Sequence, residues 1–192
     1  MRQRGMLVLH ANVVVTPHGA LAISGESGAG KSTTQAALLK RGCRMLSDDV
    51  TVLRLDPDGT VVALPGVAKM NLCEDAAIKL GHDVSLLSRN PLLGLKVIVP
   101  VAPAESMSEP VSLKKIYLIN RHHGEGLIIK RLSGMEKFAA LQECIYGPQL
   151  PEEVPALFPL VAALNQQVDI ISLHRPVRGC SVNKVAEAIL HG

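Results

Sequence analysis

Apolar residues along the chain fall into short runs that alternate with longer stretches of helical spacing. The short runs are rich in β-branched residues and are bounded by turn residues, which is typical of strands. The expected strands cover residues 7–15, 20–24, 44–47, 50–55, 60–64, 94–101, 113–120, 127–132 and 168–173. The expected helices cover residues 33–41, 74–80, 133–146, 153–166 and the C-terminal stretch from 181. Segments 82–93 and 102–110 are expected to be loops. This alternation predicts an α/β fold.

Turn signals separate two of the expected strand pairs. T-P-H-G at 16–19 has proline second and glycine fourth, and D-P-D-G at 56–59 is a second turn. Each therefore joins neighbouring strands into a hairpin. A nucleotide domain built from βαβ crossovers has mostly parallel strands, so these hairpins predict a mixed, partly antiparallel sheet. The length, without repeats or a visible linker, predicts one domain over residues 1–192.

A glycine-rich segment between the strand at 20–24 and the helix at 33–41 fits the P-loop pattern G-x-x-x-x-G-K-[ST]. Its residues are Gly25, Glu26, Ser27, Gly28, Ala29, Gly30, Lys31 and Ser32, and Thr33 follows. In such a loop, backbone N–H groups point at nucleotide phosphates, the lysine reaches the β- and γ-phosphates, and the hydroxyl can hold Mg²⁺. The order strand, glycine loop, helix is the context that the motif requires. We therefore expect ATP to bind here.

Two adjacent carboxylates, Asp48 and Asp49, follow Lys31 by seventeen and eighteen residues. A strand returning from the P-loop helix can bring one of them to the γ-phosphate, where phosphoryl transfer needs a carboxylate to orient Mg²⁺ or to accept a proton. Adjacent residues on a strand point to opposite faces, so one aspartate is expected to face the site and the other to support it. A solvated Asp-Asp turn is the alternative.

Composition narrows the class of protein. Apolar residues make up 47% of the chain and aromatic residues 2%, so the expected core is aliphatic. A net charge of +3 with scattered basic residues does not indicate nucleic-acid binding. Four cysteines lie far apart without a C-x-x-C pair, which predicts reduced thiols in a cytoplasmic protein and no zinc site. The sequence has neither a secretory signal nor an apolar run of about 18 residues, so no membrane association is expected.

Three segments together resemble the catalytic domain of bacterial HPr kinase/phosphorylase. They are residues 25–32, 37–42 and 46–50, which read G-E-S-G-A-G-K-S, A-L-L-K-R-G and L-S-D-D-V. The family has G-[DE]-S-G-x-G-K-S, L-x-x-R-G and A-D-D at the same spacing. The resemblance implies an enzyme that uses ATP and Mg²⁺ to phosphorylate a serine, which in the family belongs to HPr, a carrier protein of the sugar phosphotransferase system. It also implies a sheet related to that of phosphoenolpyruvate carboxykinase, which contains antiparallel strands.

The resemblance further implies roles for individual residues. The family has a histidine, usually followed by glycine, on the strand before the P-loop strand, and His10-Ala11 stands there. The implied catalytic residues are His10, Lys31 and Asp48, with Asp49 beside them to orient or tune the site. The implied Mg²⁺ ligands are Ser32 and Glu74.

Downstream, the chain departs from the family pattern. The family segment P-V-x-P-G-R-N, which is important for the reverse reaction, begins here as P-V-A-P at 100–103 and continues with A-E in place of G-R-N. The family's separate N-terminal domain has no counterpart in this sequence. Because the reverse reaction needs an extra anion-binding group for the attacking phosphate, we expect a forward serine kinase without appreciable phosphorylase activity. Its acceptor is a protein or peptide, HPr or another, and a homo-oligomer is left open.

Several alternatives stay open on the residues alone. A lone strand histidine such as His10 is more often structural, and the pair His122-His123 is more often part of a solvated loop. The candidates for a charge-stabilising arginine are Arg89, Arg121 and Arg175. A GTPase-like switch is a second functional class, although A-L-P-G at 63–66 lacks the aspartate of D-x-x-G and no N-K-x-D occurs. A nucleotide-binding regulatory module without catalysis is the third.

Overall fold

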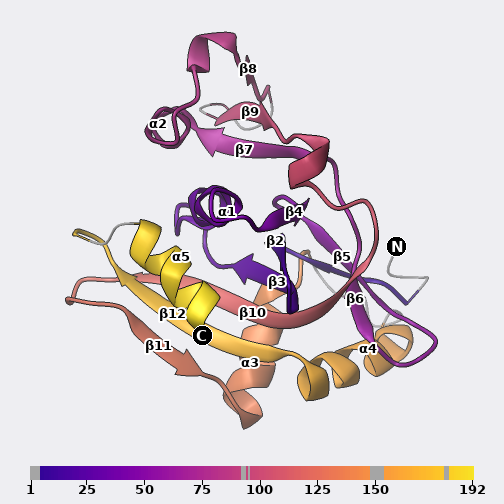
Figure 1. Cartoon of the computed structure of the whole chain (residues 1–192). Helices are drawn as coiled ribbons and strands as arrows, with labels where there is room; N and C mark the ends of the chain where they lie inside the picture. The colour runs from indigo at the N-terminus through magenta and orange to yellow at the C-terminus, as the bar shows by residue number, and fades with distance from the viewer. Residues whose placement is uncertain (1–4, 92–93, 95, 148–153, 180–181) are drawn as a thin grey trace.

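The computed structural model describes residues 5–91, 94, 96–147, 154–179 and 182–192. A large curved sheet carries helices on both faces, and a smaller sheet stands above the first helix (Figure 1). The large sheet contains β1 (Leu7–Leu9), β2 (Ala11–Thr16), β3 (Gly19–Ser24), β4 (Arg44–Ser47), β5 (Thr51–Leu55), β6 (Val61–Ala63), β10 (Val111–His122), β11 (Ile128–Arg131) and β12 (Asp169–Pro176). The small sheet contains β7 (Lys69–Cys73), β8 (Ser88–Arg89) and β9 (Lys96–Pro100). The α-helices are α1 (Lys31–Leu39), α2 (Glu74–Lys79), α3 (Gly134–Cys144), α4 (Val154–Gln167) and α5 (Val182–His191), and the short 3₁₀ helices are η2 (Val84–Leu86) and η3 (Pro103–Glu105).

Strand β10 joins the parallel and antiparallel parts of the large sheet. Its first residues pair with β6 in the antiparallel sense, and the rest run parallel to both β3 and β12. The predicted hairpins β2–β3 and β5–β6 are both antiparallel, so the mixed α/β sheet is confirmed. Because β3, β10 and β12 are parallel, their carboxyl ends lie at one edge of the sheet, which is where ligands bind in open α/β sheets. The loop from β3 to α1 leaves the sheet at this edge (Figure 1).

The core occupies both faces of the large sheet. Along β10, Ile116 and Leu118 pack in the cluster that includes α3 and α4, whereas Tyr117 and Ile119 pack in the cluster that includes α1 and α5. The Tyr117 hydroxyl also donates to the Ile189 carbonyl at 3.2 Å, which holds α5 on the sheet. A third apolar cluster joins the small sheet to α1. This last contact fixes the small sheet beside the P-loop helix.

Three local expectations differ from the structure. The strand expected over 7–15 is divided at His10, because β1 pairs with β5 while β2 pairs with β3 and β4. Strand β7 was not predicted, and β8 and η2 lie in a segment expected to be a loop. In β7 the apolar side chains Met70 and Leu72 flank a buried asparagine, Asn71. Its burial depends on hydrogen bonds to residues distant in the sequence, which a local pattern does not contain.

Helix α3 begins where the sequence predicts, and S-G-M-E at 133–136 fits the capping-box pattern, but the box is not formed. The side chain of Ser133 makes no capping hydrogen bond. Glu136, which would complete the box, instead accepts hydrogen bonds from Lys130 Nζ at 2.8 and 2.9 Å. An ion pair with the neighbouring strand β11 has therefore replaced the local cap.

Within the described part of the chain, no helix combines the length and the apolar character needed to cross a membrane. The described cysteines, Cys43, Cys73 and Cys144, are free thiols, and Cys180 lies outside the described residues. Among the described residues, no group of three or more His, Cys, Asp or Glu side chains converges as a metal site.

Candidate active site

The P-loop lies between β3 and α1, and its backbone depends on glycine at the entrance. Gly25 has a φ of 139°, and a Cβ at this position would overlap the carbonyl oxygen of Ile119 on β10. Gly30, with a φ of 109°, leads directly into α1. The loop can therefore pack against β10 only when its first residue lacks a side chain. This close contact determines how far the loop lies from the sheet.

The buried side chain of Lys31 lies across the centre of the loop. Its Nζ donates to the carbonyl oxygens of Gly25 at 2.8 Å and Glu26 at 3.3 Å. Burial is the main cause that lowers the pKa of Lys31, and the carboxylates of Asp49 and Asp48 oppose this shift. An ammonium group held by carbonyls at the N-terminus of a helix is placed to meet an anion.

Asp48 is embedded in amide groups from two other strands. Its Oδ1 accepts from Asn12 Nδ2 at 2.6 Å, and its Oδ2 accepts from the backbone N–H and the Nδ2 of Asn71 at 2.8 and 3.0 Å. Burial raises the pKa of Asp48, while the two hydrogen bonds from Asn71 act in the opposite direction. Asn12 Nδ2 also lies 2.8 Å from Gln35 Oε1 and 3.5 Å from Ser32 Oγ. Asn12 thus connects the aspartate to the first turn of α1.

Asp49 has an unusual backbone conformation beside His10. Among the described residues it is the one non-glycine residue with positive φ, at 65°. Its backbone N–H donates to Asn12 Oδ1 at 3.3 Å, and its Oδ1 lies 3.4 Å from His10 Nε2. Burial and then the positive charge of Lys31 lower the pKa of His10, and Asp49 opposes this shift. A neutral imidazole is therefore favoured near neutral pH.

The backbone of His10 is held by hydrogen bonds to the end of α3 and to strand β3. Its N–H donates to the Cys144 carbonyl at 2.8 Å, at the end of α3, and its own carbonyl accepts from Ser24 Oγ at 2.8 Å. The ring of Tyr146 meets the imidazole edge to face, with ring centres 5.9 Å apart. The break between β1 and β2 therefore places the imidazole at the P-loop in a defined orientation.

These groups meet at one cavity of about 380 Å³. Eight of the residues singled out from the sequence line it, namely His10, Ser27, Gly28, Gly30, Lys31, Ser32, Thr33 and Asp49, together with Asn71, Cys73 and Lys96 from the small sheet. Asp48 is half-buried and does not line the cavity, but it accepts hydrogen bonds from Asn12 and from Asn71, which does line it. Glu74 does not line the cavity, and its Oε1 forms an ion pair with Arg89 Nη2 at 2.7 Å.

Several residues of this site were missed or left undecided by the sequence. Asn12, Asn71 and Lys96 carry no motif and come to the P-loop only through strand pairing. The positive charge of Lys96 contributes to lowering the pKa values of His10, Lys31 and Asp48. Of the three candidate arginines, Arg175 contacts the P-loop, because its Nε donates to the Ala29 carbonyl at 2.8 Å.

The resulting site has the architecture of a P-loop fold, with a glycine loop at the carboxyl edge of a mixed sheet. A solved structure of this class, the Hpr(Ser) kinase/phosphatase from Coxiella burnetii, matches with a TM-score of 0.52 and 14% sequence identity, over 96% of this chain and 88% of that one. This likeness supports the shared fold.

Sequence comparison leads to the same group of proteins. Two HPr kinase/phosphorylases from Clostridium botulinum, strains Eklund 17B and Alaska E43, are each 27% identical over 126 residues, which is 65% of this chain. This chain spans about two fifths (41%) of the length of these relatives. A family model described as the central domain of helicase HerA matches residues 3–97, a span that contains the P-loop and the two aspartates. The resemblance to HPr kinase/phosphorylase is thus confirmed.

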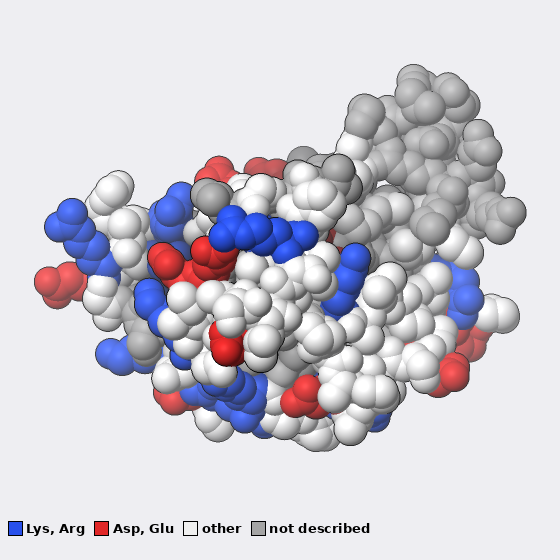
Figure 2. All heavy atoms as spheres, turned by 90° about the horizontal axis from the view of Figure 1, so that it is seen from above, with Lys and Arg blue, Asp and Glu red and all other residues white. Residues whose placement is uncertain are grey.

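The surface charge bears on the helicase similarity. On the face seen in Figure 2, basic and acidic side chains are interspersed, and neither sign forms a continuous field over the described residues. Nucleic-acid binding by charge normally uses a stripe or patch of Lys and Arg. That this chain does not bind nucleic acid stays a prediction.

Proposed function

We propose that this chain is an ATP- and Mg²⁺-dependent kinase of the HPr kinase type, which transfers the γ-phosphoryl group to a serine hydroxyl of a protein or peptide. The observation that carries the proposal is the meeting of Lys31, His10 and Asp49 at one cavity, with Asp48 bonded to Asn71 in the cavity wall. The similarity to HPr kinase/phosphorylases supports the same class. Phosphoryl transfer depends mainly on positioning and electrostatic stabilisation, and this cavity offers both.

The P-loop would hold the phosphates, with Lys31 moving from the loop carbonyls to the β- and γ-phosphate oxygens. The side chains present fit a magnesium ion. Ser32 lines the phosphate cavity, and Mg²⁺ prefers an oxygen ligand such as its hydroxyl together with substrate phosphates. When bound, the ion would neutralise charge on the β- and γ-phosphates. Glu74, held by Arg89, would have to break its ion pair to take part.

We assign the proton-accepting role to Asp48, following the family resemblance. Its raised pKa makes it a stronger base than an exposed aspartate. The bond from Asn12 is the exchangeable one, because the two N–H groups of this amide face three acceptors, on Asp48, Gln35 and Ser32. As the serine oxygen bonds to the γ-phosphorus, its proton passes to Asp48. The bond from that phosphorus to the β–γ bridging oxygen breaks, and ADP leaves.

The acceptor serine would approach from the His10 side of the P-loop. A further cavity of about 290 Å³ adjoins this side and shares His10 and Ser27 with the phosphate cavity. Asn120 and Glu143 are among its lining residues and offer polar contacts to a peptide. His10 and Asp49 would orient the incoming hydroxyl, and the neutral imidazole suits a hydrogen bond with it.

The proposal is tested by incubating the protein with γ-labelled ATP, Mg²⁺ and candidate acceptors, with HPr as the first, and by identifying phosphoserine by mass spectrometry. Lys31→Ala removes the ammonium group from a loop whose carbonyls can then bind water. We expect it to fold normally, to lose the rise in melting temperature with Mg-ATP, and to lose transfer. An equal rise in both proteins would overturn the nucleotide site. If ATP is hydrolysed at the same rate with and without each acceptor, and no phosphoserine forms, the result would favour an ATPase, as the helicase similarity suggests.

A further inference from the structure

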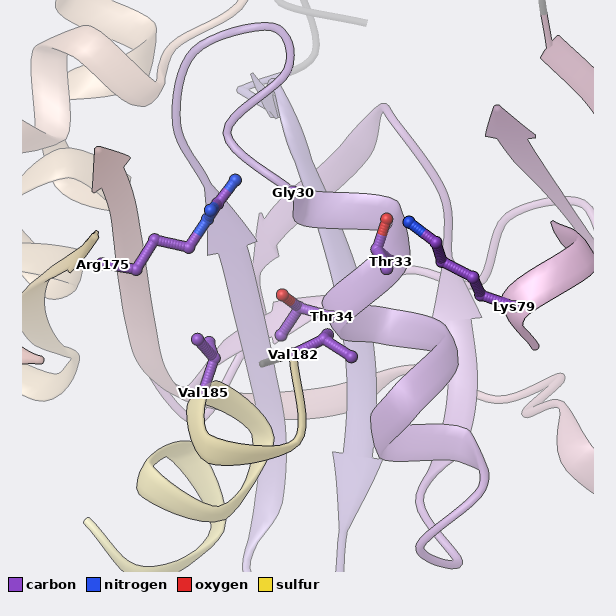
Figure 3. A pocket seen from close by; sticks show the side chains of 7 residues that line it. All are labelled: Gly30, Thr33, Thr34, Lys79, Arg175, Val182 and Val185. Atoms are coloured by element: carbon purple, nitrogen blue, oxygen red, sulfur yellow. The ribbon is translucent and has the colours of Figure 1, made fainter. Parts of the chain in front are cut away.

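Besides the phosphate cavity and the smaller cavity beside His10, the structure has a cavity of about 450 Å³ on the other side of the P-loop helix. It is called the second cavity below. Among the described residues, Gly30 and Thr33 line both this cavity and the phosphate cavity. Figure 3 shows Arg175 reaching from β12 toward Gly30, Val182 and Val185 facing α1 from α5, and Lys79 approaching Thr33 from α2. This volume lies within the range of about 300–1,000 Å³ that is usual for small-molecule sites.

The position of the reactive groups fixes which end of a nucleotide can reach this cavity. His10 and Asp49 line the phosphate cavity and do not line the second one. A triphosphate laid on the loop with its γ-phosphorus at these groups must therefore extend its α-phosphate away from them. Gly30 and Thr33, which both cavities share, form the natural crossing point. The part of the nucleotide beyond the α-phosphate would then enter the second cavity.

The lining chemistry suits a nucleoside. Val182 and Val185 provide an apolar wall for a flat ring, and Thr33 and Lys79 stand at the rim as partners for ribose hydroxyls or the α-phosphate. The guanidinium of Arg175 is held in place, because Nε donates to the Ala29 carbonyl at 2.8 Å and Nη1 to the Pro176 carbonyl at 3.3 Å. A fixed planar guanidinium stacks well on an aromatic ring.

We propose that this cavity binds the nucleoside part of the nucleotide, with the base between Arg175 and the valines of α5. The inference rests on the proposed function, since it needs a nucleotide on the P-loop. It makes the C-terminal helix, which is far from the P-loop in the sequence, part of the nucleotide site. It also gives Arg175 a positioning role at the base and removes it from the reacting phosphate.

The test distinguishes binding of the nucleoside from binding of the phosphates. Calorimetric titrations compare ATP with inorganic tripolyphosphate, both in the presence of Mg²⁺. Val182→Phe fills the cavity from the first turn of α5, where Val182 is only partly buried. We expect about tenfold weaker binding of ATP and unchanged binding of tripolyphosphate. Leu190→Phe, on the exposed part of the same helix, is the matched control and is expected to bind both ligands like the parent.

Each outcome bears on a different claim. If Val182→Phe binds ATP like the parent, the nucleoside lies elsewhere and the inference is wrong, although the proposed function stands. If the parent protein binds neither ATP nor tripolyphosphate, the proposed function is wrong, and the inference that rests on it is wrong as well. If Val182→Phe does not fold, photolabelling the parent with 8-azido-ATP decides: label on residues 175–185 supports the inference, and label confined to other segments overturns it.

Discussion

At the scale of single residues, the candidate site is defined by buried polar groups that satisfy one another. Asp48 accepts from Asn12 and Asn71, and Asn71 in turn accepts from Asn90 Nδ2 at 2.7 Å through its own Oδ1. No described buried side-chain nitrogen or oxygen lacks a hydrogen-bond partner. Such a network holds a carboxylate in one orientation, because each movement would leave a buried donor unpaired.

The role of Asp48 is testable by a substitution that keeps its size. Asp48→Asn removes the proton acceptor, so phosphoryl transfer should fall by at least about a hundredfold, while Mg-ATP still raises the melting temperature. Rates from the γ-labelled ATP assay and thermal shifts on the same samples give both quantities. A near-normal rate would move the base to Asp49, whose carboxylate lines the cavity.

The side chain of Asn71 should set the pH at which transfer begins. Its hydrogen bonds lower the pKa of Asp48 against the stronger effect of burial. Asn71→Ala removes the side-chain bond, so the pKa rises further and Asp48 stays protonated to a higher pH. We expect the acidic limb of the rate profile to move to higher pH. Asn183→Ala, on the surface of α5, should leave the profile in place, and an unmoved limb in Asn71→Ala would argue against Asp48 as the titrating base.

At the scale of elements, the P-loop depends on the strand beneath it. Gly25→Ala places a methyl group against the Ile119 carbonyl in a backbone conformation that alanine rarely adopts. We expect it to lower the free energy of unfolding by about 2–4 kcal/mol, from overpacking and backbone strain together. Gly59→Ala also has positive φ, at 83°, but meets open space, so it should cost only about 1 kcal/mol.

Urea unfolding of both glycine variants measures the difference. Equal losses in the two proteins would mean that β10 does not determine the position of the loop.

The sequence could predict those parts of the fold and site that are local. The P-loop, the hairpins and the helix after Gly30 follow from spacing and turn residues within a few positions. Strand β7 and the break at His10 could not be predicted, because both depend on which distant strand supplies the partner. The same reason explains why the sequence did not single out Asn71 and Lys96, whereas it did single out Lys31 and the aspartates.

At the scale of the whole molecule, the candidate active site lies between the two sheets. The P-loop comes from the large sheet, while Asn71, Cys73 and Lys96 come from the small one, which packs on α1. That residues 1–192 behave as one domain stays a prediction, and a ligand bound between the sheets offers a way to test it.

We expect Mg²⁺ with a non-hydrolysable ATP analogue to slow amide hydrogen exchange in β7 and β9 as well as in the P-loop. A nucleotide that contacts both sheets stabilises both against local opening. Strand β11, exposed at the far edge, serves as the internal control and should exchange at an unchanged rate. Protection confined to the P-loop and α1 would show that the small sheet takes no part in binding.

The backbone at Asp49 allows two selective pressures to be separated. Glycine or asparagine would adopt a φ of 65° at lower cost than aspartate or most other residues. In a library of random variants recovered only for correct folding, position 49 should therefore drift toward glycine or asparagine. In a library selected for catalytic activity, position 49 should remain an acidic residue. The frequencies of the two outcomes in deep sequencing would measure how much stability the chain gives up to keep a carboxylate beside His10.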